Sequence, residues 1–168
     1  MIPGIAIRFA GPEDITIIGF LAQEIWPLTY KEILSEDQLQ YMMDRIYSPA
    51  SLMNQMLEQK HTFLIIEEDE EPIGFASYSI IDEHGIYKLH KIYVLPGQQG
   101  KGLGKLIINF IVADITPSGA TALHLNVNRY NKAKSFYEKI GFVVIREEDI
   151  DIGNNYFMND YIMELKLI

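Results

Sequence analysis

A strand, a glycine-rich loop and the start of a helix follow one another in Leu89-His90-Lys91-Ile92-Tyr93-Val94-Leu95-Pro96-Gly97-Gln98-Gln99-Gly100-Lys101-Gly102-Leu103-Gly104-Lys105. The β-branched and aromatic residues before Leu95 favour a strand, and Pro96 with Gly97 should end it. Apolar residues then recur at helical spacing from Leu103 onward. Because the first N–H groups of a helix lack intrahelical partners and face a ligand with a positive dipole end, this loop is predicted to bind a phosphate or diphosphate.

Spacing excludes two common phosphate-binding loops. A P-loop requires a lysine after its second glycine, but Leu103 follows Gly102. A dinucleotide-binding fingerprint that begins at Gly100 would need its third glycine at position 105, which is Lys105. A tight strand-to-helix turn that binds nothing remains an alternative when this stretch is considered alone.

Length and composition favour one globular domain over residues 1–168. Hydrophobic residues make up 48% of the chain, but no apolar run approaches the roughly 18 residues of a membrane span. The N-terminus has no signal-peptide pattern, so a cytoplasmic protein with no membrane partner is predicted. A net charge of −9 argues against a nucleic-acid partner and mildly favours cationic substrates such as amines.

The absence of cysteine excludes disulfides, thiolate metal sites and a cysteinyl acyl-enzyme, and no metal site is predicted.

The order of the remaining elements indicates a mixed α/β domain. Ser35 with Gln38 three residues later predicts a capping box at the start of one helix. Trp26-Pro27 is expected to end the preceding helix, which begins at residue 12. Helices are predicted at 12–26, 35–46, 49–57, 103–116 and 132–140. Strands are predicted at 5–9, 63–66, 73–81, 86–94, 123–127, 142–151 and 156–167. Without repeats or linkers, these elements should form one sheet covered by helices.

A second motif follows the loop at residues 126–142, where Asn131, Ala133 and Tyr137 precede Glu138-Lys139-Ile140-Gly141-Phe142. Together with Val94-x4-Gln99-x2-Gly102-x-Gly104, it resembles the two hallmarks of the GCN5-related N-acetyltransferases, the GNAT family. The resemblance covers nearly the whole chain. It implies a central twisted, mostly antiparallel sheet of six to seven strands flanked by about four to five helices, and acetyl-CoA as co-substrate.

The resemblance also implies where coenzyme A binds. The strand ending at Val94 should splay from its neighbour, so that its backbone contacts pantetheine and the N–H of Ile92 polarises the acetyl carbonyl. Asn131 and Tyr137 are further expected contacts, although Asn131 lies one residue closer to Ala133 than in many members, which leaves Asn128 as an alternative. The complete predicted set is Ile92, Tyr93, Val94, Gln99, Gly100, Lys101, Gly102, Leu103, Gly104, Lys105, Asn131 and Tyr137.

Acetyl transfer to an amine requires a base for the ammonium and an acid for the departing thiolate. Tyr137 occupies the family's tyrosine position and is the predicted acid, because a phenol with a pKa near 10 is protonated at neutral pH. His90 lies on the strand face of Ile92 and is the predicted base, acting directly or through water. The alternatives are a packing tyrosine and a histidine that is only hydrogen-bonded at the sheet surface.

The acceptor site is the least defined part of the sequence. The resemblance places it at the first helix pair and the loop between the last strands, which offer Trp26, Thr29, Tyr30 and Tyr156. Aromatic rings suit a cationic amine, and the region from Ile25 to Met42 resembles bacterial spermidine/spermine N-acetyltransferases of the GNAT family. A polyamine acceptor is therefore favoured over a protein N-terminus or an antibiotic amine. A non-catalytic acetyl-CoA-binding regulatory module is the alternative outside enzymes, and a homodimer is possible.

Overall fold

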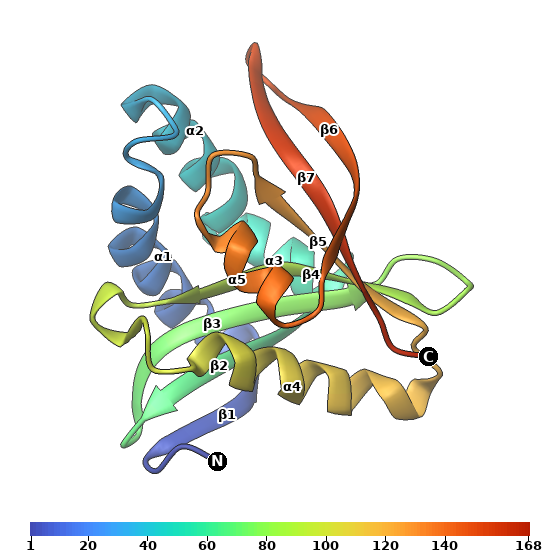
Figure 1. The fold of residues 1–168 in the computed structure, drawn as a ribbon. Coiled ribbons are helices and arrows are strands. Elements are labelled where there is room, and N and C mark those ends of the chain that lie inside the picture. The colour runs from blue at the N-terminus through green and yellow to red at the C-terminus, as the bar shows by residue number, and fades with distance from the viewer. The chain divides into compact units, whose positions relative to one another are not determined.

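The computed structural model describes residues 1–168 and divides into two compact units. The first unit consists of Met1–Ser79 and Lys91–Phe110, and the second of Ile80–His90 and Ile111–Ile168. Strand β4 (Ile86–Val94) and helix α4 (Leu103–Ile115) each continue from one unit into the other (Figure 1). The prediction of a single domain over residues 1–168 stays a prediction.

Seven strands and five α-helices make up the fold. The helices are α1 (Ile15–Tyr30), α2 (Glu36–Tyr47), α3 (Pro49–Leu57), α4 and α5 (Ala133–Lys139). The other strands are β1 (Ile5–Ala10), β2 (Thr62–Glu68), β3 (Glu71–Ile80), β5 (Ala122–Asn128), β6 (Val143–Gly153) and β7 (Tyr156–Lys166). The strand order is β1-β2-β3-β4-β5-β7-β6, with β4 and β5 parallel and the β1–β2, β2–β3, β5–β7 and β6–β7 pairs antiparallel. The predicted mixed α/β fold with a mostly antiparallel sheet is confirmed. No helix is both long and apolar enough to cross a membrane.

In the first unit, α1 continues past Pro27 to Tyr30, so the prediction that Trp26-Pro27 ends this helix is wrong. Proline removes one helical hydrogen bond, but the last turn is held by aromatic packing. Trp26 and Tyr30 are buried, with ring centroids 4.6 Å apart. The Tyr30 hydroxyl also lies 2.8 Å from that of Tyr93 on β4. These contacts offset the missing backbone bond.

The first strand is tied to the start of α1 by a buried carboxylate. Asp14 is 4% exposed and accepts hydrogen bonds from two Arg8 nitrogens, at 3.1 and 2.9 Å, and from the Gly11 N–H at 3.0 Å. The Arg8 guanidinium also donates to Glu67 at 2.7 Å. These bonds to Arg8 lower the pKa of Asp14, so the ionised form stabilises this corner of the unit.

Replacing Asp14 by Asn is expected to lower the free energy of unfolding at pH 7 by about 2 kcal/mol, because charge-assisted bonds to a buried acceptor are lost. The folded pKa lies below the unfolded value of roughly 3.9. The stabilisation is therefore present above that value and is lost as the pH falls through the folded pKa. Urea unfolding at pH 7 and at pH 3 measures both effects. The exposed neighbour Glu13, changed to Gln, is the control, and an equal loss in both variants would contradict the assignment.

In the second unit, β5 lies between β4 and β7, and β6 is the outer strand. The parallel register joins Ile86–Leu89 of β4 to Ala122–Leu125 of β5 and ends there. Strands β6 and β7 form a long hairpin (Figure 1). Its two turn residues, Asn154 and Asn155, have φ angles of 55° and 60°, which asparagine tolerates and which match the twist of a two-residue hairpin.

The sheet of the second unit has one apolar and one polar face. Leu125 on β5 stands opposite Met163 on β7, and both are buried. Helix α5 lies on this face, since the Lys134 ammonium is 5.2 Å from the ring centroid of Tyr161, which pairs with Val127. Side chains of alternate residues point to the other face. That face carries Lys88, His124, Asn126, Asn128, Asp160 and Glu164.

Candidate functional site

The glycine-rich loop has the backbone conformation that the sequence predicts for an anion site. Gly100 and Gly102 both have φ of 80°, a region that residues with a Cβ rarely adopt. A Cβ placed on either glycine would meet no atom within 4 Å, so the loop surface is open at both positions. A ligand can therefore approach the main chain directly here.

The backbone N–H groups of this loop are largely unused by the protein. Its own bonds run from Gln98 N–H to the Leu95 carbonyl at 2.8 Å and from Gln99 N–H to the Pro96 carbonyl at 3.4 Å. Helix α4 closes its first turn with the Leu106 N–H on the Gly102 carbonyl at 3.2 Å. The N–H groups from Gly100 to Lys105 thus precede the first intrahelical donor. Six consecutive amides can serve one diphosphate, whereas Gln99 donates within the loop.

Side chains hold the loop against the end of β2. Glu68 accepts a hydrogen bond from Gln98 Nε2 at 2.7 Å and lies 3.7 Å from the Lys101 ammonium. Lys101 also donates to Gln98 Oε1 at 2.7 Å. Glu68 was not predicted from the sequence, because 30 residues separate it from Gln98 and no local pattern links them. This carboxylate fixes one wall of the loop.

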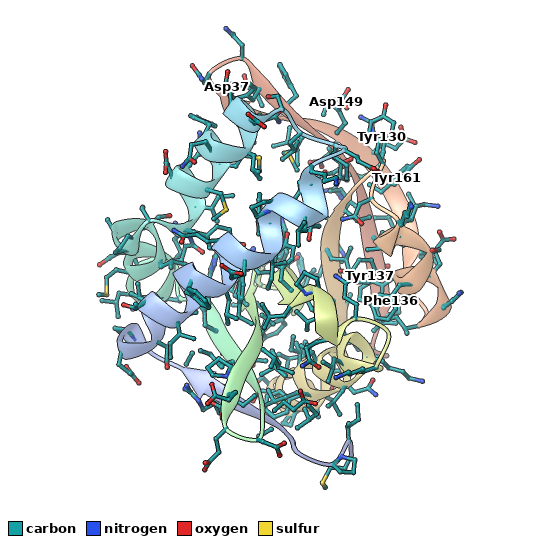
Figure 2. All side chains as sticks on the ribbon, turned by 90° about the vertical axis from the view of Figure 1, so that its left-hand side faces the viewer. Asp37, Tyr130, Phe136, Tyr137, Asp149 and Tyr161 are labelled. Atoms are coloured by element: carbon teal, nitrogen blue, oxygen red, sulfur yellow. The ribbon has the colours of Figure 1, made fainter.

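Tyr137 lies in the second unit on α5 and is 8% exposed. Its ring centroid is 5.2 Å from that of Phe136 and 5.7 Å from that of Phe142. Figure 2 shows the Phe136 and Tyr137 side chains next to each other on the helix. Helix α5 ends at Lys139 with Ile140 as its C-cap, and Gly141 follows with a positive φ of 109°, which glycine adopts without strain. Packing thus fixes the tyrosine ring that the second motif predicts as the acid.

Both candidate asparagines form local turns. The side-chain oxygen of Asn131 accepts the Ala133 N–H at 2.9 Å, and that of Asn128 accepts the Tyr130 N–H at 2.9 Å. Such bonds to the N–H two residues ahead are Asx turns. Each side-chain oxygen therefore accepts a local bond in the segment that joins β5 to α5.

The predicted base and the predicted carbonyl-polarising amide lie on the same strand but in different units. His90 on β4 is half-buried in the second unit, and Ile92, Tyr93 and Val94 belong to the first. Lys88 lies two residues before His90 and is half-buried. Desolvation lowers the pKa of Lys88, so this strand carries a lysine that loses its proton more easily than an exposed one.

The predicted substrate residues of the first unit form part of an aromatic core. Trp26 is 4% exposed, and its indole N–H donates to the Tyr47 hydroxyl at 3.0 Å. Thr29 is half-buried and donates its hydroxyl to the Ile25 carbonyl at 3.0 Å. Tyr30 reaches Tyr93 as described above. These hydrogen bonds hold the three side chains in place. If they bind the substrate, they do so as part of the packed core of this unit. Tyr156, half-buried at the start of β7, belongs to the second unit.

Comparison with known proteins identifies the family. Residues 30–159 match the acetyltransferase (GNAT) domain family. The chain belongs to the GNAT family. The fold agrees: the structure of PaiA N-acetyltransferase from Thermoplasma acidophilum in complex with coenzyme A superimposes with a TM-score of 0.82, at 30% identity over 96% of this chain and 98% of that one. This GNAT protein is thus an N-acetyltransferase, as its two motifs predict.

Two curated relatives of similar sequence are named for different acceptors. A spermidine N(1)-acetyltransferase from Thermoplasma acidophilum is 30% identical over 167 residues, which cover 96% of this chain and 97% of the relative. A ribosomal protein bS18-alanine N-acetyltransferase from Haemophilus influenzae is 33% identical over 100 residues, covering 59% of this chain and 63% of the relative. One relative is named for acetylation of spermidine and the other for acetylation of an alanine of ribosomal protein bS18.

Proposed function

We propose that this GNAT protein transfers the acetyl group of acetyl-CoA to a primary amine of a small cationic substrate, with a polyamine favoured. The loop carries the proposal, since no hydrogen bond within the protein uses the N–H groups from Gly100 to Lys105 and the space beside Gly100 and Gly102 is open to a diphosphate. The net charge of −9 favours a cationic acceptor. The spermidine acetyltransferase is also similar over nearly the full length of both chains.

The chain offers a residue for each catalytic task. On the family resemblance, we assign polarisation of the thioester carbonyl to the Ile92 N–H and protonation of the coenzyme A thiolate to Tyr137. His90 is the base that takes the amine proton. Direct attack of the amine in a ternary complex needs no covalent enzyme intermediate, which suits a chain without cysteine.

The test is release of the coenzyme A thiol from acetyl-CoA in the presence of spermidine, an aminoglycoside, or a peptide with an N-terminal alanine. Turnover with spermidine at the highest kcat/KM is expected. Turnover with the peptide alone would favour a protein N-terminus, which the shorter match to the bS18-alanine enzyme also suggests. Tight coenzyme A binding without release for any acceptor would favour a non-catalytic binding module.

A further inference from the structure

One buried carboxylate in the second unit lacks the hydrogen-bond donors that it requires. Asp160 on β7 is 5% exposed. Its Oδ2 atom accepts a single hydrogen bond from Asn126 Nδ2 at 3.4 Å, which is long, and its Oδ1 atom has no partner. A buried carboxylate normally accepts several bonds, because burial removes its water. Asp160 is therefore prepared for a donor that the folded chain does not supply.

The residues around Asp160 are polar and belong to several strands. The register places Asn128 on β5 and Glu148 on β6 opposite Asp160. The Lys88 ammonium on β4 and the Arg129 guanidinium attract the carboxylate, and Glu148 repels it. Neither Lys88 nor Arg129 forms an ion pair with Asp160, and Arg129 instead pairs with Glu147 and Asp149. The cations nearby thus compensate the carboxylate only in part and without a direct bond.

The ligand that best satisfies this site is an alkylammonium group. Burial raises the pKa of Asp160, and a bound cation would offset the desolvation of the ionised carboxylate. A primary ammonium supplies three donors on a slim stem. It can replace the weakly held Asn126 amide and reach Oδ1. A phosphate or carboxylate ligand would be repelled by Asp160 and Glu148 together.

We propose that Asp160 binds a protonated nitrogen of the acceptor amine and so determines the preference of the enzyme for cationic acceptors. This inference rests on the proposed acetyltransferase function. Strand β4 carries Lys88 and, two residues later, the predicted base His90 on the same polar face as Asp160, and all three residues belong to the second unit. A polyamine carries several cationic nitrogens, so one can be held by Asp160 while another reacts. No proton transfer to Asp160 is required.

The variant Asp160→Asn keeps the shape of the side chain and removes its charge. Its KM for spermidine is expected to rise at least about tenfold, since hydrogen bonds to charged groups contribute most to binding. The KM for acetyl-CoA and the kcat at saturating spermidine should stay within about twofold. Thermal unfolding should show no loss of stability, because the uncompensated charge is removed.

The matched control is Asp149→Asn, an exposed carboxylate on β6 that pairs with Arg129. Its variant should keep the KM for spermidine within about twofold. An unchanged spermidine KM in Asp160→Asn, or an equal rise in both variants, would overturn the inference while acetyl transfer by the parent protein still stands. The inference about Asp160 would also be overturned if the parent protein neither acetylates spermidine nor binds it in calorimetry. If the parent protein does not bind coenzyme A, the proposed function itself is overturned.

Discussion

Replacing Tyr137 by Phe is expected to lower kcat at least about 100-fold while the affinity for coenzyme A changes little. A positioned general acid typically accelerates a reaction by about 10² to 10⁴, and the phenol hydroxyl is the only group that this change removes. The ring should stay in place, because Phe136 and Phe142 pack against it and it is 8% exposed. Steady-state release of the coenzyme A thiol measures kcat, and calorimetry measures the affinity.

Tyr130→Phe is the matched control for this prediction. Tyr130 lies seven residues before Tyr137 in the same motif segment and is 75% exposed. Its hydroxyl should be dispensable, so both kinetic parameters should remain near those of the parent. If Tyr137→Phe retains full kcat, the tyrosine serves packing alone and the thiolate is protonated by another group or by water.

Local sequence patterns predicted much of the fold. Ser35 is the N-cap of α2 as its sequence position predicts, since its hydroxyl accepts the Gln38 N–H at 3.1 Å. Such signals work because donor and acceptor lie within one helical turn. Local patterns gave wrong predictions where contacts between residues distant in the sequence determine the structure. Helix α1 passes Pro27 because aromatic residues from other elements hold its last turn.

Helix α3 shows the same limit more clearly. Its apolar spacing predicts that Met53 and Leu57 face inward, but they are 38% and 48% exposed, while Gln55 is 6% exposed. The reason is a buried polar pair, in which the Lys91 ammonium on β4 donates to Gln55 Oε1 at 2.6 Å. The ammonium also lies 5.5 Å from the ring centroid of Phe63, a favourable cation–π distance. A periodicity rule treats both polar residues as surface residues.

Some residues of the candidate site were predictable from local sequence patterns, and others were not. The loop from Gly100 to Lys105 was predictable, because glycine spacing directly reports the backbone conformation that an anion site needs. Glu68 and Asp160 were not, because each acquires its role from residues that are distant in the sequence. The proposed role of Asp160 is the hardest to predict, since a buried carboxylate oxygen without a donor is recognisable only when its surroundings are known.

Replacing Gly102 by Val is expected to weaken coenzyme A binding about 100-fold, or ~2.7 kcal/mol. A β-branched residue at φ of 80° is strained by roughly 1–3 kcal/mol, and its side chain would occupy the open surface over the first amides of α4. Gly97→Ala is the control, because a Cβ there also meets open space and no positive φ is required. Calorimetry with coenzyme A compares the two variants, and circular dichroism checks that both are folded. Equal affinities in two folded variants would show that the loop is only a turn, and the diphosphate would then have to bind elsewhere.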